Sequence, residues 1–125
     1  MRPKNLTLTP QELEIMKIVW RLGHATVRDV YEALLADRKI AYTTVMTMMK
    51  ILEDKGHLKK RRNDRAYIYQ ATQPQNIVIR AMIREFVDRV FNGSAEPLLL
   101  HLVEDRRISR RALDRISRMV REGAE

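Results

Sequence analysis

The sequence has no cysteine among its 125 residues. This absence excludes a disulfide framework, a thiolate zinc site, an iron–sulfur cluster and a cysteine nucleophile, and it suits a reducing cytosol. No apolar run approaches the roughly 18 residues that a membrane-spanning helix needs, and the N-terminal segment has no apolar stretch like that of a signal peptide. We therefore expect a cytoplasmic protein without a membrane partner, and the length indicates one domain or a domain with a small addition.

Glycine is scarce as well, and its positions are informative. Each of Gly23, Gly56, Gly93 and Gly123 follows a stretch with apolar residues at three- and four-residue spacing, where a helix often ends in a left-handed residue. No glycine is then left for a loop that cradles a phosphate, and no nucleophile motif occurs. The sequence therefore predicts a mostly helical fold, no catalytic residues and no enzymatic activity.

The three histidines are far apart in the sequence. His24 and His57 each follow a predicted helix end, which favours loop or strand-entry positions over metal ligands. His101 has Glu104 and Asp105 three and four residues further on, but no second histidine lies nearby, and a polar residue at the edge of a core explains it better than a ligand. We predict no metal site and no cofactor.

Positive charge is what the chain has in excess, with 24 Lys and Arg against 16 Asp and Glu, a net charge of +8. Residues 1–73 carry 14 basic and 8 acidic side chains, whereas residues 74–125 carry 10 and 8. Within the first region, six basic side chains gather at Lys55, Lys59, Lys60, Arg61, Arg62 and Arg65. Such a cluster favours a phosphate-rich partner, although a solvated basic face is the plainer alternative.

Helix-capping signals organise the first part of the chain. Thr9 precedes Pro10 and has Glu12 three residues on, a capping box, and Thr26 has Asp29 in the corresponding place. Together with the apolar spacing, these signals predict helices over about residues 10–22, 27–37 and 42–55.

A different pattern follows Gly56. Leu58–Arg62 and Tyr67–Ala71 are separated by a turn-prone Asn-Asp pair, and the second stretch is rich in β-prone residues. We predict a β-hairpin with a basic, exposed tip. The polar segment Ala71–Pro74 is typical of a connector, after which three further helices are expected over residues 77–91, 97–104 and 110–121.

Three helices followed by a basic hairpin are the element order of a winged helix-turn-helix. Residues 1–73 are therefore predicted to be a DNA-binding domain and residues 74–125 a helical dimerisation domain. The third helix buries Val45, Met48, Met49 and Leu52 at helical spacing, which leaves its opposite face for the major groove. The predicted DNA-binding residues are Thr43, Thr44, Met46, Thr47 and Lys50 on the helix and Lys60, Arg61, Arg62 and Arg65 on the wing.

Several stretches resemble the penicillinase repressor (BlaI/MecI) family of transcriptional regulators. They follow one another in the order and spacing of that family, over about residues 6–110, at Leu8–Met16, Val19–Trp20, Ala25–Val30, Ala41–Met49 and Leu52–Gly56. The resemblance implies a homodimeric transcriptional repressor that binds double-stranded DNA at dyad operators. It also implies that repression in the inducible members ends when a regulatory protease, triggered by a membrane-bound sensor, cleaves the repressor.

The second region supports dimerisation independently of the resemblance. Its three predicted helices each carry a stripe of apolar residues. A segment of about 50 residues is too small to bury all of this apolar surface by itself. A partner chain is the expected cover, with packing against the first region of the same chain as the alternative. The predicted dimerisation residues are Ile79, Met82, Ile83, Phe86, Val90, Leu99, Leu102, Leu113, Ile116 and Val120.

At one position the sequence departs from the family. The inducible members carry an Asn-Phe scissile pair, and the corresponding residues here are His101 and Leu102. A protease pocket built for an Asn side chain and a Phe ring loses both features. Regulated cleavage at this bond, release by another signal and constitutive repression therefore all stay open.

Two other functions fit the same pattern. The chain could be a nucleic-acid-binding protein without sequence preference, because a basic surface binds phosphates regardless of sequence. Alternatively, it could be a winged-helix module for protein interaction, in which the basic wing meets an acidic protein surface.

Overall fold

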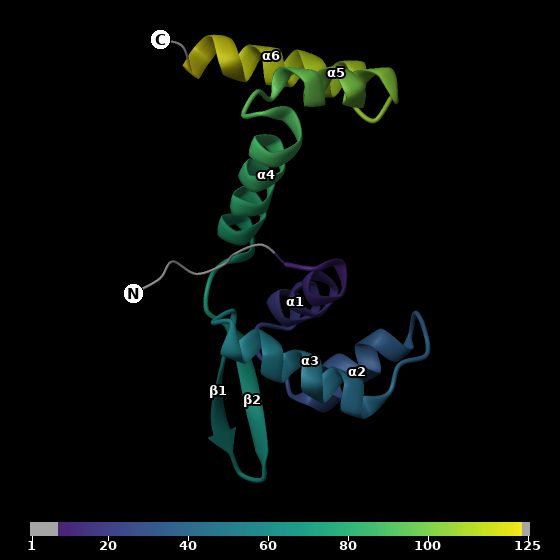
Figure 1. Cartoon of the computed structure of the whole chain (residues 1–125), viewed down its shortest axis with the longest axis vertical. Helices are drawn as coiled ribbons and strands as arrows, with labels where there is room; N and C mark the ends of the chain where they lie inside the picture. The colour runs from purple at the N-terminus through teal and green to yellow at the C-terminus, as the bar shows by residue number, and fades with distance from the viewer. Residues whose placement is uncertain (1–7, 124–125) are drawn as a thin grey trace. The chain divides into compact units, whose positions relative to one another are not determined.

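The computed structural model describes residues 8–123 and consists of two compact units that divide between Ile83 and Arg84. Its elements follow in the order α1 (Pro10–Leu22), α2 (Val27–Leu35), α3 (Tyr42–Asp54), β1 (Leu58–Asn63), β2 (Ala66–Ala71), α4 (Gln75–Phe91), α5 (Glu96–Glu104) and α6 (Arg110–Gly123) (Figure 1). The prediction of a mostly helical winged helix-turn-helix followed by three helices is confirmed.

The capping signals form as the sequence predicts. Thr9 Oγ1 accepts a hydrogen bond of 3.1 Å from the backbone N–H of Glu12, whose carboxylate accepts one of 3.0 Å from the N–H of Thr9. Thr26 and Asp29 make the same reciprocal pair, with both bonds at 3.0 Å. These bonds satisfy backbone donors that the first turn of a helix leaves free. They fix the starts of α1 and α2.

Gly23, Gly56 and Gly93 have the positive φ angles that the predicted helix ends require, at 83°, 91° and 87°. The expectation for Gly123 is wrong. It is the last residue of α6 as the structure describes that helix, and it is not among the glycines with positive φ. Glycine tolerates helical backbone angles as well as left-handed ones, so its presence alone does not end a helix.

One apolar core holds the first unit together. It is formed by inward-facing side chains of α1, α2 and α3, by the base of the hairpin and by the first half of α4. The largest of its fully buried members are Ile15, Met16, Val19, Val30, Leu34, Val45, Met49, Leu52 and Val78. Burying one such side chain contributes about 1.5–3 kcal/mol, so this core positions α3 and the wing firmly.

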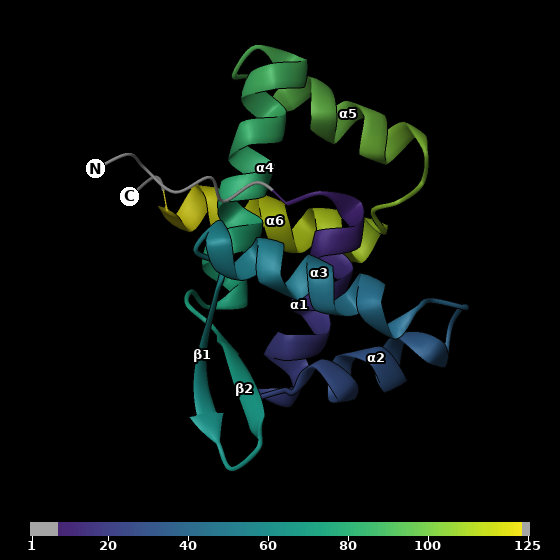
Figure 2. The same cartoon turned by 60° about the horizontal axis from the view of Figure 1, so that its bottom comes forward.

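The wing is an antiparallel hairpin in which Leu58 pairs with Ala71 and Asn63 with Ala66, one residue pair longer than predicted. It is tied to the helices by Ala25, between α1 and α2. The Ala25 N–H donates to the Tyr69 carbonyl at 3.0 Å, and the Tyr69 N–H donates to the Ala25 carbonyl at 2.7 Å. Figure 2 shows the hairpin projecting from the three helices.

The first half of α4 belongs to the first unit. Val78 lies in its core with 1% of its surface exposed, and the half-buried Met82 packs against that core. The structural division therefore falls after Ile83, whereas the sequence pattern places the connector at Ala71–Pro74. An apolar stripe along α4 does not by itself show which part of the helix serves which unit.

The second unit contains the remainder of α4 together with α5 and α6. Neither α5 nor α6 contains a buried residue. The Ser109 hydroxyl accepts a 3.0 Å hydrogen bond from the Ala112 N–H and thereby caps the start of α6. No helix within residues 8–123 is both long enough and apolar enough to cross a membrane.

Candidate nucleic-acid interface

The burial of α3 sets which of its side chains can reach a ligand. Val45, Met49 and Leu52 have no exposed surface, and they turn the opposite side of the helix to solvent. Met48, which was also expected to be buried, is half-buried and packs against the same core. All five predicted base-reading residues lie on the solvent side, at Thr43, Thr44, Met46, Thr47 and Lys50. The predicted division of α3 into two faces is confirmed, and contact with DNA bases stays a prediction.

Lys50 is available to a ligand although it has an internal partner. Its Nζ lies 3.2 Å from Asp54 Oδ1, one helical turn further on, and both side chains are more than 60% exposed. Surface pairs of this kind contribute about 0.3–0.5 kcal/mol, so a stronger acceptor displaces the carboxylate at little cost.

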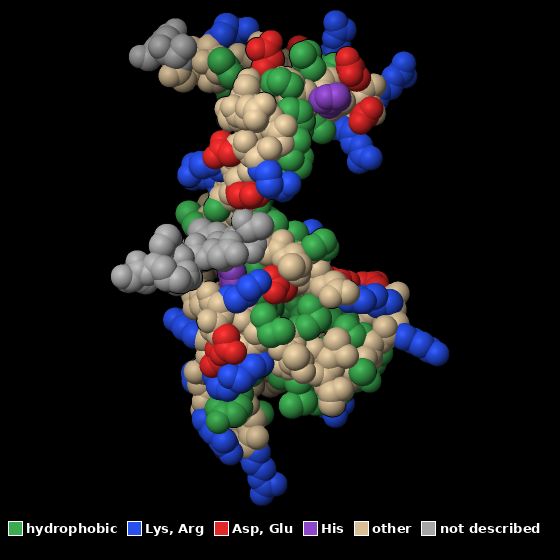
Figure 3. All heavy atoms as spheres, viewed as in Figure 1, with side chains coloured by type: hydrophobic (Ala, Val, Ile, Leu, Met, Phe, Trp, Pro, Cys, Tyr) green, Lys and Arg blue, Asp and Glu red, His purple; other side chains and the backbone are tan. Residues whose placement is uncertain are grey.

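The hairpin distributes its basic side chains over two faces. Lys60 lies opposite Tyr69 and Arg62 opposite Tyr67, so these four side chains share one face of the two-stranded sheet. Arg61 lies on the other face, because successive side chains of a strand alternate. Figure 3 shows Lys and Arg side chains along the hairpin as far as its tip.

Two of the six basic residues between positions 55 and 65 form ion pairs with carboxylates of the protein. Lys55 Nζ lies 2.8 Å and 3.0 Å from the two carboxylate oxygens of Glu12, and Lys60 Nζ lies 3.3 Å from Glu53 Oε1. The pKa of Lys60 is raised, and the largest cause is its interaction with the Glu53 carboxylate. Among the described residues, the part of the cluster without an ion pair is therefore smaller than the sequence suggests: it comprises Lys59, Arg61, Arg62 and Arg65.

The pair of Glu12 and Lys55 joins the start of α1 to the end of α3. The Glu12 side chain is only 9% exposed. Burial works to raise the pKa of its carboxyl group, but the Lys55 ammonium and the Thr9 backbone N–H outweigh that effect, and the net shift is downward. The carboxylate therefore stays charged in the fold and helps to hold α3 against α1.

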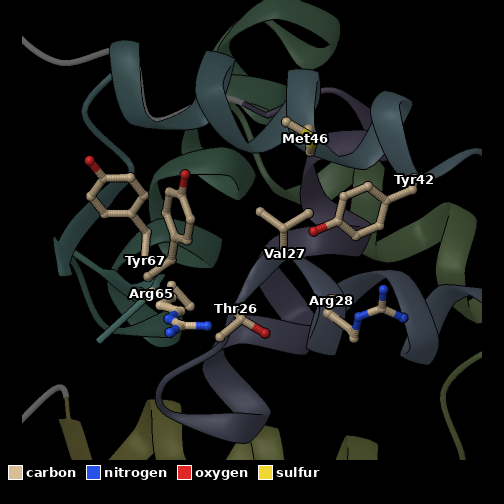
Figure 4. A pocket seen from close by; sticks show the side chains of 9 residues that line it. Thr26, Val27, Arg28, Tyr42, Met46, Arg65 and Tyr67 are labelled. Carbon is tan, nitrogen blue, oxygen red and sulfur yellow. The ribbon is translucent and has the colours of Figure 1, made fainter. Parts of the chain in front are cut away.

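The exposed side of α3 and the wing border a common groove of about 490 Å³. Tyr42 and Met46 line it from α3, Arg65 and Tyr67 line it from the hairpin, and Arg28 lines it from the first turn of α2 (Figure 4). The groove thus combines aromatic and apolar walls with two guanidinium groups from different elements. These are the surfaces that contact base edges and phosphates in protein–DNA complexes.

Sequence reasoning missed several groove residues, including Thr26, Arg28, Tyr42 and Tyr67. Arg28 stacks with Tyr42, with its guanidinium carbon 5.6 Å from the ring centroid. A signal for Arg28 was present, because it follows the helix cap at Thr26 and the first turn of a helix attracts phosphates. Nothing in the local sequence indicates that Tyr42 and Tyr67 face the same groove.

Most of the predicted dimerisation residues present apolar surface to solvent in this single chain. Ile83, Phe86, Val90, Leu99, Ile116 and Val120 are exposed, and Ile79, Leu102 and Leu113 are half-buried. Met82 differs, because it packs against the core of the first unit. The role of these residues in dimerisation stays a prediction.

His101 lies on the exposed side of α5 with its ring centroid 6.0 Å from that of Phe91. It is not a core-edge residue in this chain, contrary to the expectation from the sequence. Within residues 8–123, no three or more His, Cys, Asp or Glu side chains gather in a way that could hold a metal ion.

Comparison with known families agrees with this architecture. The profile of the penicillinase repressor family matches residues 8–122. The chain belongs to the penicillinase repressor family. The transcriptional regulator BlaI of Mycobacterium tuberculosis is 37% identical to it over 95 residues, which cover 74% of this chain and 69% of the relative. Membership makes the chain a DNA-binding transcriptional repressor rather than an enzyme.

Two solved structures of penicillinase repressor relatives share the winged-helix fold. The DNA-binding domain of the repressor BlaI superposes with a TM-score of 0.53 at 24% identity, over 58% of this chain and 90% of that domain. The monomeric form of Bacillus licheniformis BlaI, in complex with the blaP half-operator, gives a TM-score of 0.51 at 24% identity, over 61% and 92%. At this identity the two likenesses establish the fold.

Proposed function

We propose that this member of the penicillinase repressor family represses transcription as a homodimer that binds dyad operators in double-stranded DNA with sequence specificity. The observation that carries the proposal is the common groove bordered by the exposed side of α3 and the basic wing. A helix about 10–12 Å across fits the major groove, which is about 12 Å wide. In this arrangement α3 enters the major groove and the hairpin follows the neighbouring phosphate backbone.

The side chains on α3 match the chemistry of base edges. Lys50 can donate hydrogen bonds to guanine O6 and N7, and the hydroxyls of Thr43 and Thr47 can bond bases or phosphates. The methyl groups of Thr44 and Met46 can pack against the methyl group of thymine. The arginines of the wing supply phosphate contacts, chiefly Arg61, Arg62 and Arg65, and these contacts set the position of the protein on the duplex.

Dimerisation is proposed because α5 and α6, which make up most of the second unit, bury no side chain. In the whole of α6 no side chain is buried, and Val120 is 66% exposed. Its apolar residues lie on one face of the helix, and its arginines lie on the opposite face. A second copy that covers the apolar face would remove this surface from water and would place two α3 helices on one dyad operator.

The proposal is tested by comparing the affinity of the full chain for the upstream DNA of its own gene with its affinity for a scrambled duplex, over a series of salt concentrations. We expect clear preference for the upstream duplex and a steep loss of affinity with salt. Each phosphate contact adds about 0.9 to the slope of log K against log salt. Replacing Arg61 and Arg62 with Ala should flatten the slope, whereas replacing the exposed Lys17 on α1 should leave it unchanged.

The other possible functions appear as different outcomes of the same titration. Equal affinities for both duplexes would indicate a nucleic-acid-binding protein without sequence preference, and no binding would indicate a protein-interaction module. Light scattering at micromolar concentration provides the second measurement. A monomeric full-length chain would contradict the assignment of the dimerisation residues.

Regulated proteolysis between His101 and Leu102 is part of the proposal only as one way of ending repression. Both residues lie within α5, and a protease that takes an extended substrate must first unfold that helix. α5 has nine residues and no buried side chain, so its isolated stability is low. Cleavage there would separate α6 from the rest of the dimerisation region. Release by another signal and constitutive repression are the alternatives.

A further inference from the structure

Lys60 differs from the other basic residues of the wing because its ammonium group lies beside a carboxylate of α3. Its Nζ is 3.3 Å from Glu53 Oε1, in the last turn of α3, and the two side chains are only 28% and 25% exposed. Glu53 Oε1 itself has no surface in contact with solvent. The ion pair therefore spans the junction between the helix that is proposed to read bases and the hairpin that is proposed to follow the backbone.

The same ammonium group is held from a second direction by an aromatic ring. Lys60 Nζ lies 4.3 Å from the ring centroid of Tyr67, a favourable cation–π distance. The Tyr67 hydroxyl accepts a hydrogen bond of 3.4 Å from Arg62, whose guanidinium carbon is 5.3 Å from the ring centroid. A chain of contacts thus runs from Glu53 on α3 through Lys60 and Tyr67 to Arg62.

The hairpin needs such a connection. A two-stranded hairpin is at best marginally stable on its own, and this one is fixed at its base by the buried Leu58 and by the bridge between Ala25 and Tyr69. Beyond the base its residues are mostly exposed. In the described part of the chain, the pair of Glu53 and Lys60 is the ion pair that joins α3 to the hairpin.

We infer that Glu53 and Lys60 are positioning residues that set the angle of the wing relative to α3, and that Lys60 does not serve as a phosphate contact. The inference rests on the proposed DNA binding and identifies what aligns its two contact surfaces. Lys60 was expected from the sequence to bind DNA together with Arg61 and Arg62. Its partners instead direct its charge toward the protein.

The inference predicts an effect of unusual sign at Glu53. A carboxylate near a DNA-binding surface repels phosphates, so its neutralisation ordinarily raises affinity for all sequences. If Glu53 aligns the wing, Glu53→Gln should instead lower affinity for the upstream duplex while affinity for a scrambled duplex stays equal or rises. The ratio of the two affinities should fall about tenfold, because residues in direct contact are energetically coupled.

A charge exchange provides the decisive experiment on the full-length protein. Lys60→Glu alone should weaken binding to the upstream duplex, and the double variant Glu53→Lys with Lys60→Glu should recover most of the loss, to within about threefold of wild type. The exchange restores the net charge that Lys60→Glu removes, so a control of equal net charge is needed to separate the contact from the overall field. The matched control pairs Glu53→Lys with Lys59→Glu. It has the same net charge, but Lys59 lies on the other face of the strand, and no recovery is expected.

The salt dependence supplies an independent measurement. Lys60→Met should leave the slope of log K against log salt at the wild-type value. A decrease of about 0.9 per protomer would show that Lys60 contacts a phosphate and would overturn the inference. Failure of the charge exchange to restore binding, in variants whose thermal unfolding matches wild type, would overturn it as well.

The proposed function and the positioning role of Glu53 and Lys60 are refuted by different results. If the wild-type protein does not prefer the upstream duplex over the scrambled one, the proposed function fails, and the inference fails with it. If the wild type shows that preference but the Glu53→Gln variant keeps the full affinity ratio, only the inference fails.

Discussion

The position of the boundary between the two units can be tested by truncation. Val78 lies in the core of the first unit, and Met82 packs against it, although both follow the connector indicated by the sequence. A fragment that ends at Ile83 keeps both side chains, whereas a fragment that ends at Gln73 loses them. Both fragments keep the 2.9 Å hydrogen bond from Trp20 Nε1 to the Gln73 carbonyl. They therefore differ chiefly in the first half of α4.

The magnitude follows from the buried surface. A fully buried valine contributes about 1.5–3 kcal/mol, and the half-buried methionine adds roughly 1 kcal/mol more. We expect the fragment ending at Gln73 to be about 3 kcal/mol less stable than the fragment ending at Ile83. This is a large share of the 5–15 kcal/mol typical of a domain. With a urea dependence of about 1 kcal/mol per molar, the unfolding midpoint should fall by roughly 3 M.

Urea titration followed by the fluorescence of Trp20 provides the assay. Within the longer fragment, Val78→Ala should cost about 2 kcal/mol, because it removes two methyl groups and leaves a small cavity. Ile77→Ala is the matched control, because Ile77 is adjacent in α4 and 39% exposed, and it should cost much less. Equal midpoints for the two fragments would refute the reasoning and would return the boundary to Ala71–Pro74.

The remaining predictions concern base contacts by α3, the pH dependence of folding stability and the way in which repression ends. Thr47→Ala should cost roughly 1–3 kcal/mol of affinity for the operator and much less for random DNA, and equal losses in a gel-shift titration would remove α3 from base reading. The lowered pKa of Glu12 means that its pair with Lys55 stabilises the fold above the ordinary glutamate pKa and loses this effect as pH falls through the folded value. Thermal unfolding of Glu12→Gln should therefore depend less on pH below about 5 than wild type does. In cells treated with a cell-wall antibiotic, mass spectrometry should find a fragment ending at His101 if proteolysis ends repression, whereas derepression with an intact chain would exclude it.

Local signals were enough to predict most of the secondary structure. Thr9 and Thr26 start helices because their hydroxyls and the acidic residues three positions later satisfy neighbouring backbone groups. The turn after Asn63 closes the hairpin with Asp64 in a left-handed conformation, at a φ of 58°. The exposed side of α3 also followed from spacing alone, because burial of Val45 and Met49 fixes the opposite face.

The sequence pattern could not show how α4 is divided between the two units, because its apolar residues lie on one face along the whole helix. Its stripe has helical spacing throughout, but Val78 completes the core of the first unit, while Ile83 and Val90 are exposed. The sequence shows that a face is apolar, and only packing shows which surface covers it. Gly123 lies within α6 although the spacing before it suggested a helix end, because glycine also tolerates helical backbone angles.

The sequence by itself determined the order of the elements, the exposed face of α3 and the total of basic residues on and near the wing, because these depend on neighbours within a few positions. The tertiary structure decided which of those charges are free. Lys55 is engaged by a carboxylate 43 positions earlier in the chain, and Lys60 by one on a different element. Electrostatic attraction depends on distance in space rather than along the chain, so a count of Lys and Arg gives the charge of the wing but not the direction in which each charge acts.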